Sequence, residues 1–376
     1  MKDRGNPLLK KIDRYIGIPL TYVLGCCRTS RQLPIIKDKS LPLSFLIIKT
    51  AAIGDTVLTE PMLREIRNNY PQARFTYICT KTNKAMVELL PGVEKIYVFS
   101  LRQPLKSLRA VAKLGEFDFL LDFTPWDKLD SIISYFAKAK YKVGFKHKNM
   151  YRHYVYDAYV NHLDSKHEID NYRALLTSCG LHIQGLKPHL SIEKCDLENI
   201  YNPLFESYIV LHICAGGSKA FLKSWNIYNW QELAEQLYKK YQLPFVFTGG
   251  LSDLDTIQLI SLFCKGKGIP CLVTAGDFSL AQTGTVLKLA KLLITIDTGI
   301  MHLGAAVGAR VIALQGPTSE QRWGPIGDYC ITVHTPMSCS PCISLGFDTD
   351  CTRASCMEAI TVEQVIEAAD KFMIAK

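Results

Sequence analysis

The stretch that decides the fold runs from residue 292 to residue 318 and reads LLITIDTGIMHLGAAVGARVIALQGPT. Its two short apolar runs, Leu292–Ile296 and Arg310–Leu314, have the composition of buried strands, and a short helix is predicted between them. A strand, a helix and a second strand in this order predict a parallel pair, because parallel strands need a crossover connection. Four residues that could bind a ligand lie where the first strand passes into the helix: Asp297, Thr298, Gly299 and His302.

The same alternation extends through both halves of the chain. Strands are predicted in the first half at Phe45–Lys49, Arg74–Cys79, Lys95–Phe99, Phe117–Asp122 and Lys142–Phe145. Further strands are predicted in the second half at Tyr208–Ile213, Phe245–Thr248 and Cys271–Thr274. Helical patterns lie between the strands, among them Thr56–Asn69, Asp127–Ala137, Ser165–Ser178, Trp230–Tyr241, Leu254–Cys264 and Leu280–Ala290. This alternation is typical of parallel sheets with helices on both faces, so the fold class is α/β.

The length of 376 residues is enough for two such domains. The predicted division is an N-terminal arm at 1–42, a first domain at 43–190, a linker at 191–207, a second domain at 208–360 and a C-terminal helix at 361–376. Two tandem domains of this kind place a cleft between them, and ligands of open α/β sheets bind at the carboxyl ends of the strands. The loops that follow the strands are therefore where functional residues are expected.

The charge is concentrated in the arm. The chain carries a net charge of +9, and residues 1–40 hold nine Lys and Arg against three Asp, which leaves only +3 for the rest. The body is therefore not a strongly basic nucleic-acid-binding surface. The thirteen cysteines are mostly scattered, which suits the reducing cytosol.

Three interpretations of the arm remain open. Its uncharged run, Tyr15 to Cys27, is shorter than the roughly 20 residues that span a bilayer. The arm could lie on an anionic membrane surface, with apolar side chains in the headgroup region and basic side chains on the lipid phosphates. It could instead be a secretory or lipoprotein signal, since Val-Leu-Gly-Cys at 23–26 is similar to a lipid-attachment box, or a helix packed on the body. Pro19 argues against one uninterrupted helix.

The first loop of interest follows the strand that ends near Lys49 and reads Ala-Ala-Ile-Gly-Asp. Asp55 opens a helix there, so it could be an N-cap that binds free backbone amides. Alternatively, its carboxylate could act as general base on an acceptor hydroxyl, with Gly54 leaving room for the substrate.

The second loop, after the strand that ends near Cys214, contains glycines, a serine and lysines. Glycines let backbone amides approach an anion, and lysines supply positive charge, although a solvated surface loop is the alternative. The spacing is not that of a Walker loop, and no Gly-x-Gly-x-x-Gly follows a strand. The candidate phosphate-binding residues are Gly216, Gly217, Ser218 and Lys223.

The third loop contains Asp253 and Asp255. Asp-x-Asp resembles the metal-binding pair of metal-dependent sugar transferases, but a three-residue match is weak, and helix capping is the favoured interpretation.

The fourth loop is the opening stretch. A helix that starts at Gly299 presents free amides to a phosphate, and Thr298 can add a hydroxyl donor. His302 lies one turn further on, where it could face the ligand or be a buried core histidine. Asp297 would repel a phosphate unless it binds hydroxyls or orders the loop, so the pattern fits a nucleotide diphosphate with a sugar nearby.

Three of these segments together resemble a known family. Asp-Thr-Gly-Ile-Met-His followed by VIALQGPTSEQRWGP, the stretch IIKTAAIGDTVLTEPMLREIRNNYP and Lys-Ser-Trp in the second loop resemble the ADP-heptose:lipopolysaccharide heptosyltransferases of glycosyltransferase family 9. The resemblance runs from Leu43 to Gly327. It implies a GT-B fold, in which two Rossmann-like domains with parallel sheets face a central cleft, with the acceptor in the first and the nucleotide sugar in the second.

The resemblance also assigns roles. It implies that Asp55 is the catalytic base and that Lys223 contacts the diphosphate. The other donor-binding residues it implies are Gly216, Gly217, Ser218, Asp297, Thr298, Gly299, Met301 and His302, with either Asp253 or Asp255 on the ribose. The serines usual before the first-loop glycine are Ala51 and Ala52 here.

The implied reaction is transfer of a heptose from ADP-heptose to the lipopolysaccharide inner core, with inversion at the anomeric carbon. No metal or other cofactor is expected, since lysine and a helix N-terminus supply positive charge to the leaving ADP. The expected location is the cytoplasmic face of the inner membrane. Residues that could bind an acidic acceptor are Gly54, Arg102, Lys106, Lys146 and Arg152, with a solvated surface as the alternative for the basic ones. A different nucleotide sugar, a nucleotide-sugar-binding module without turnover, and a secreted lipoprotein are the other hypotheses.

A last cluster of residues lies near the C-terminus. Cys339, Cys342, Cys351 and Cys356 have a spacing compatible with a structural zinc site, with reduced thiols or disulfides as alternatives. The final segment, Thr361–Met373, reads as an amphipathic helix, which in GT-B folds commonly crosses back to the first domain.

Overall fold

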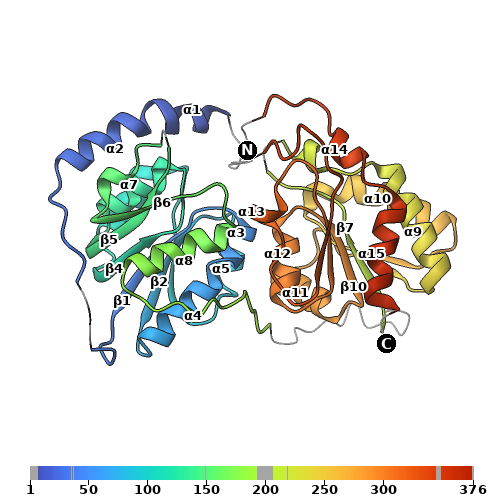
Figure 1. The fold of residues 1–376 in the computed structure, drawn as a ribbon, viewed down its shortest axis with the longest axis horizontal. Coiled ribbons are helices and arrows are strands. Elements are labelled where there is room, and N and C mark those ends of the chain that lie inside the picture. Colours follow the sequence, from blue (N-terminus) through green and yellow to red (C-terminus); the bar gives the residue numbers. More distant parts are fainter. Residues whose placement is uncertain are drawn as a thin grey trace. The chain divides into compact units, whose positions relative to one another are not determined.

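The structure is a computed structural model that describes residues 7–34, 36, 38–148, 150–192, 206–217, 219–343 and 349–374. The chain forms two compact units, Met1–Lys187 and Pro188–Lys376 (Figure 1). The boundary between the two units therefore lies slightly before the predicted linker. Most of that linker falls outside the described residues.

The first unit is built on a six-stranded sheet with the order β3-β2-β1-β4-β5-β6, and all its strand pairs are parallel. The strands are β1 (Ser44–Ile48), β2 (Arg74–Cys79), β3 (Val93–Val98), β4 (Glu116–Asp122), β5 (Lys138–Lys146) and β6 (Ala158–Asn161). The central strand β1 is almost entirely buried because its apolar side chains meet helices on both faces. The helices are α3 (Ile53–Val57), α4 (Glu60–Asn69), α5 (Lys84–Val87), α6 (Pro104–Val111), α7 (Lys128–Phe136) and α8 (Glu168–Ser178), with the 3₁₀ turn η1 (His153–Val155).

The single helix predicted at Thr56–Asn69 is two helices, α3 and α4. Pro61 lies in the first turn of α4, where its missing N–H costs nothing. The break leaves Asp55 on the short helix α3, directly after β1.

The second unit repeats the architecture with the strand order β12-β11-β10-β7-β8-β9, again all parallel. Its strands are β7 (Ile209–His212), β8 (Phe245–Phe247), β9 (Cys271–Val273), β10 (Leu292–Ile296), β11 (Val311–Leu314) and β12 (Cys330–Val333). The strand, helix and strand of the opening stretch are confirmed as β10, α12 (Gly299–Ala306) and β11. The other helices are η3 (Ala220–Lys223), α9 (Ile227–Tyr241), η4 (Leu251–Asp253), α10 (Leu254–Gly266), α11 (Leu280–Leu289), α13 (Glu320–Trp323), α14 (Ser355–Glu358) and α15 (Val362–Met373).

The C-terminal helix differs from the expectation that it crosses back to the first domain. α15 packs on α9, β11 and β12 of its own unit, and Val365 and Ala369 enter the core of that unit. The helix therefore completes the second unit.

The N-terminal arm forms two helices, α1 (Pro7–Tyr15) and α2 (Gly17–Cys26), as Pro19 led us to expect. Both lie against α7 of the first unit (Figure 1). The Asp13 carboxylate accepts hydrogen bonds from the backbone amides of Lys128 (2.8 Å) and Leu129 (3.2 Å) and so caps α7. The Thr21 hydroxyl donates to the Tyr151 carbonyl at 3.0 Å. The structure thus supports the packed-helix interpretation of the arm, and no helix among the described residues is long and apolar enough to cross a membrane.

Candidate active site

Asp55 lies at the carboxyl end of the central strand of the first unit, in the first turn of α3. It is not the N-cap, because Ala52 occupies that position. Its Oδ2 atom lies 3.1 Å from Nζ of Lys49, whose side chain is wholly buried. The lysine also donates to the Phe123 carbonyl at 3.2 Å and lies over the Trp126 ring, 5.2 Å from its centroid. A fixed cation therefore holds the Asp55 carboxylate in place.

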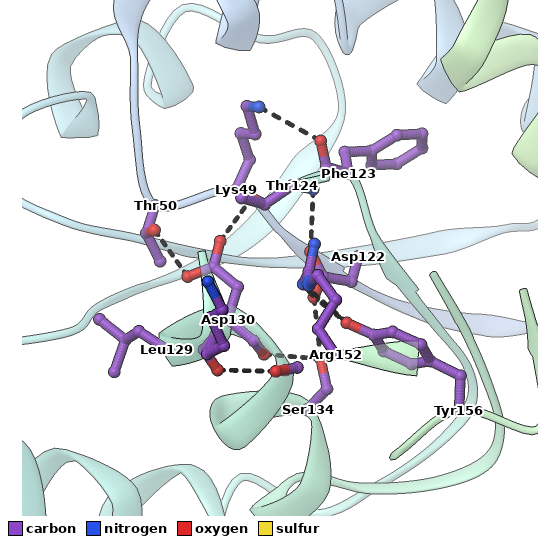
Figure 2. A network of polar contacts seen from close by, with 12 residues as sticks. Lys49, Thr50, Asp122, Phe123, Thr124, Leu129, Asp130, Ser134, Arg152 and Tyr156 are labelled. Carbon is purple, nitrogen blue, oxygen red and sulfur yellow. Dashed lines mark hydrogen bonds and ion pairs between the residues drawn. The ribbon is translucent and has the colours of Figure 1, made fainter. Parts of the chain in front are cut away.

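A buried polar network lies next to this loop and is centred on the carboxylates of Asp122 and Asp130 (Figure 2). The Thr50 hydroxyl donates to Asp130 at 2.7 Å, and the Thr124 hydroxyl donates to the other carboxylate oxygen. Burial, together with the neighbouring Asp122 and Asp127 carboxylates, raises the pKa of Asp130 to about 7, although the hydrogen bonds from Thr124 and Thr50 oppose this. The residues that follow Lys49 and Phe123, Thr50 and Thr124, are thus anchored to α7 next to the loop that carries the Asp55 carboxylate.

Arg152 differs from the expectation of an acceptor-binding surface cation. Its side chain is completely buried, and its guanidinium pairs with Asp122 and donates to the Tyr156 hydroxyl at 2.7 Å (Figure 2). The charge of Arg152 is used inside the protein, because Asp122 would otherwise be an unpaired buried carboxylate.

The other predicted acceptor-binding residues keep positions compatible with that role. Arg102 and Lys106 are exposed and follow β3, and Lys146 is exposed at the end of β5. Gly54 is buried within α3, beside Asp55. These positions lie near the carboxyl ends of their strands, where α/β sheets bind ligands.

In the second unit, Lys223 and Asp297 form the main ion pair. Lys223 ends the 3₁₀ turn η3, and its Nζ lies 2.7 Å from Oδ2 of Asp297, directly after β10. Burial opposes ionisation of Asp297, but Lys223 outweighs it with help from His302 and the Thr318 hydroxyl, so the net effect is a lowered pKa for this carboxyl. Asp297 thus stays ionised and orders the lysine.

The first turn of α12 follows this pair. Thr298 is the N-cap, but its side chain makes no capping bond, and its buried hydroxyl has no hydrogen-bond partner among the described residues. His302 is buried close enough to Asp297 to influence its charge. Met301 is wholly buried in the core, so only its backbone could contact a ligand. The hydroxyl of Thr298 and the free amides from Gly299 onward together offer several donors to an anion.

A cavity of about 210 Å³ lies at the carboxyl end of β7 in the same unit. Asp253 lines it, whereas Asp255 is exposed on α10, which distinguishes the two candidates. The Asp253 carboxylate also accepts a hydrogen bond from the Gly250 amide at 2.8 Å, which closes the 3₁₀ turn η4. Asp253 is the N-cap residue of α10, but its side chain makes no capping bond to that helix, so the predicted cap of the next helix is not formed. The other lining residues are Ile213, Cys214, Ala215, Ser224, Trp225, Ile227, Trp230 and Thr256. The cavity combines tryptophan rings and apolar side chains with one carboxylate and two hydroxyl side chains, which suits a planar base packed on the rings or a sugar whose hydroxyls donate to the carboxylate.

The glycines of the second loop leave room for a ligand. A side chain at Gly216 would meet no atom within 4 Å, and Gly217 has a φ of +93°, which favours glycine. The predicted contact at Ser218 lies outside the described residues.

The cysteine cluster does not form a preassembled metal site. All four cysteines of the cluster are free thiols: Cys339, Cys342, Cys351 and Cys356. Among the described residues, three metal-ligating side chains come together in only one group, which lies in the first unit and contains no cysteine. The disulfide alternative is therefore wrong for this structure, and the zinc hypothesis stays a prediction.

Two Rossmann-like units, each with a lysine–aspartate pair after a central strand, place the chain among GT-B glycosyltransferases. The family model for glycosyltransferase family 9 (heptosyltransferase) matches residues 105–351, which is more than half of the chain. Lipooligosaccharide heptosyltransferase 2 of Haemophilus influenzae is 23% identical over 302 residues, which cover 76% of this chain and 87% of that protein.

Solved structures agree in fold. A family 9 glycosyl transferase from Veillonella parvula superposes with a TM-score of 0.72 at 21% identity and covers 90% of this chain and 99% of its own. The E. coli heptosyltransferase WaaC with ADP gives 0.70 at 18% identity and covers 88% and 99%. The chain belongs to glycosyltransferase family 9, and the predicted GT-B fold is confirmed.

Sequence reasoning missed two features of the site. The sequence places Lys49 only at the end of a strand and does not predict its ion pair with Asp55. A lysine at the end of an otherwise apolar run is the signal that could have indicated a buried, paired cation. The second feature is the aromatic wall of the cavity, formed by Trp225 and Trp230. Their rings meet edge to face in the folded unit, a contact that no pattern in the sequence predicts.

Proposed function

We propose that the protein is an inverting glycosyltransferase that moves a heptose from ADP-heptose to the lipopolysaccharide inner core. The observation that carries the proposal is the Asp55 carboxylate, which a buried lysine holds at the carboxyl end of the central strand of the first unit. The relatives are lipooligosaccharide and lipopolysaccharide heptosyltransferases, which supports the choice of donor and acceptor.

In this proposal Asp55 removes the proton from an acceptor hydroxyl. The oxygen then attacks the anomeric carbon from the face opposite the diphosphate, so the configuration inverts. The carboxylate suits this role because Lys49 fixes its position while leaving it partly open to solvent.

The donor is assigned to the second unit. Lys223, the Thr298 hydroxyl and the first amides of α12 would neutralise the charge that develops on the departing ADP. Asp253, at the wall of the cavity, would accept hydrogen bonds from ribose hydroxyls. Because these residues provide positive charge and hydrogen-bond donors, transfer is proposed to need no metal.

The test separates chemistry from donor binding. We expect Asp55→Asn to lower transfer by about 10²–10⁴-fold, while calorimetry shows unchanged ADP affinity. Asp170→Asn is the matched control, since it removes a partly exposed carboxylate of the same unit that pairs with Arg173. Retained turnover in Asp55→Asn would refute the base, and the nucleotide-sugar-binding module would then be the better hypothesis.

The donor sugar is tested by thermal unfolding with a panel of nucleotide sugars. A ligand that binds the native state raises the melting temperature, and at equal concentration a tighter ligand gives the larger rise, which grows with the logarithm of its concentration divided by its dissociation constant. ADP-heptose is expected to give the largest rise. A larger rise with another nucleotide sugar would favour the alternative, a family 9 enzyme with a different donor and a different lipid-linked or surface saccharide as acceptor.

We further propose that the arm holds the enzyme on the anionic cytoplasmic face of the inner membrane. On α2 the small residues Gly17, Thr21 and Gly25 face the body, where a side chain at either glycine would collide with Lys128 or Tyr154. The large apolar side chains face solvent instead: Tyr15, Ile16, Leu20, Tyr22 and Val23. This is the reverse of an ordinary surface helix, and the exposed Lys11 and Arg14 nearby add attraction to anionic lipid.

Flotation with phosphatidylglycerol-containing vesicles tests the arm. Because Asp13 caps α7, deleting the arm would disturb the body, so the double variant Leu20→Ser and Val23→Ser is preferable. Leu105→Ser, which changes an exposed leucine of α6, is the control. Loss of flotation in the double variant alone is expected, and equal flotation of all three proteins would rule out the membrane role.

A further inference from the structure

The ends of β5 and β6 bring two histidines and an aspartate together outside the proposed transfer site. Lys146 and Asn161 are paired in the sheet, so His147 and His162, the next residues, emerge side by side, with ring centroids 5.3 Å apart. Asp164 follows two residues later. One ligating atom from each of the three lies within 4.8 Å of the others.

Hydrogen bonds fix which nitrogen of each ring faces this point. The Nε2 atom of His162 lies 2.9 Å from a Glu168 carboxylate oxygen, which can only accept, so Nε2 donates and Nδ1 carries the lone pair. The Nδ1 atom of His147 lies 3.1 Å from the Lys148 carbonyl, so Nδ1 donates there and Nε2 is the nitrogen that faces Asp164. Both outer contacts are those that orient metal-binding histidines in proteins.

Both ring nitrogens face the Asp164 carboxylate. Nε2 of His147 lies 3.2 Å from Oδ2 of Asp164, within hydrogen-bond distance, and Nδ1 of His162 lies 3.7 Å from Oδ1. The His162 side chain is completely buried, and its Nδ1 makes no hydrogen bond to the described residues. A proton on Nε2 of His147 accounts for the contact with Asp164 but leaves Nδ1 of His162 without a partner. One metal ion would bind both ring nitrogens and the carboxylate.

We propose that His147, His162 and Asp164 bind one divalent transition-metal ion, with Glu168 orienting His162. Two imidazoles and one carboxylate suit Zn²⁺ and the neighbouring first-row ions. Ligands about 2.1 Å from zinc lie roughly 3.4 Å apart in a tetrahedron, so the observed separations need only small adjustments. Asp164 is half exposed, which leaves a coordination position open to solvent. The ion clamps the ends of β5 and β6 to the start of α8, and the proposed transfer reaction does not depend on it.

Cobalt absorption tests the site, because Co²⁺ replaces Zn²⁺ and its spectrum distinguishes ligand types. The full chain, treated with a chelator and reduced, is titrated with Co²⁺ alone. We expect one ion with visible d–d bands and no thiolate charge-transfer band, which separates this site from the cysteine cluster. His147→Asn should abolish those bands, Glu168→Gln should weaken affinity about 10–100-fold, and His334→Asn, an exposed histidine of the other unit, should change nothing.

His147 is the primary variant because its side chain is 10% exposed, whereas that of His162 is completely buried, and the melting temperature of His147→Asn without metal should lie close to that of the wild type. His162→Asn is a second variant if it folds. Unchanged Co²⁺ affinity in His147→Asn, or spectra that show only thiolate ligation, would overturn the proposal and leave His147 and Asp164 as an ordinary ion pair.

Discussion

Replacing Lys223 by glutamine tests the electrostatics of the donor site. Its Nζ lies 2.7 Å from Oδ2 of Asp297, and the two side chains are 19% and 10% exposed. At an effective dielectric constant near 20 the gross attraction is about 6 kcal/mol, and desolvation of both charges offsets much of it. Removing one partner of a buried pair leaves an unpaired charge and typically costs about 3–5 kcal/mol. We therefore expect Lys223→Gln to lower the free energy of unfolding of this unit by about 3 kcal/mol.

Urea unfolding followed by tryptophan fluorescence measures this change. The fluorescence reports chiefly on the second unit, which contains three of the four tryptophans, Trp225, Trp230 and Trp323. The double variant with Asp297→Asn should cost less than the sum of the single variants by about 1–3 kcal/mol, since the two side chains interact directly. Lys240→Gln is the matched control, because it breaks an exposed pair with Asp370, and such pairs contribute at most about 1 kcal/mol.

The effect on ADP affinity separates two roles for Asp297. Loss of a charged hydrogen bond from Lys223 to the diphosphate should weaken ADP binding about 10–100-fold. If Asp297 only orders Lys223, Asp297→Asn should tighten ADP binding about threefold, because it removes an exchange partner and a repulsive charge. If it binds ribose hydroxyls instead, the same variant should weaken binding. Normal ADP affinity in Lys223→Gln would refute the proposed phosphate contact.

Three further predictions concern single side chains. Thr298→Val should leave stability unchanged or slightly higher, since the buried hydroxyl has no hydrogen-bond partner, yet calorimetry should show weaker ADP binding. Lys49→Met should lower transfer strongly while ADP affinity stays normal, because it frees Asp55 without touching the second unit. For Asp130, burial raises the pKa to about 7, so between pH 4 and 7 the folded state binds the proton that the unfolded state has lost. Stability should therefore fall as pH rises through this window, by at most about 1.4 kcal/mol per pH unit from this group, and Asp130→Asn should flatten that slope in urea unfolding.

Several strands have bounds that agree with the predicted runs. β10 is buried along its whole length, so its apolar run leaves few alternatives. The bounds of β2 also agree, although Arg74 is exposed and Thr76 half exposed. The edge strands β6 and β12 were not predicted. β6, Ala-Tyr-Val-Asn, alternates between half-exposed and exposed positions and has no continuous apolar run, and β12, Cys-Ile-Thr-Val, is only four residues long and mostly half exposed. Edge position alone does not explain the difference, since the edge strands β3 and β9 were predicted.

The site residues divide in the same way. Asp55 and Lys223 could be predicted because each follows a buried strand within a loop of distinctive composition. Arg152 could not be placed, since its buried partner Asp122 lies thirty residues away and their pairing exists only in the folded sheet. The choice between Asp253 and Asp255 likewise depends on a single turn of helix, which decides that one carboxylate lines the cavity and the other meets solvent.

The two lysine–aspartate pairs have opposite orientations toward solvent, and this difference suits their proposed roles. In the first unit the lysine, Lys49, is wholly buried and the carboxylate of Asp55 is 13% exposed, so the group available to a substrate is a base. In the second unit the carboxylate of Asp297 is the more buried partner and Lys223 the more exposed, so the group available is a cation. In each pair the more buried side chain neutralises the charge of the more exposed one. Because the buried side chain cannot reach solvent, it does not bind the ligand itself. We propose that the same kind of ion pair, with the burial of its members exchanged, serves as a proton acceptor in one unit and as a phosphate-binding group in the other.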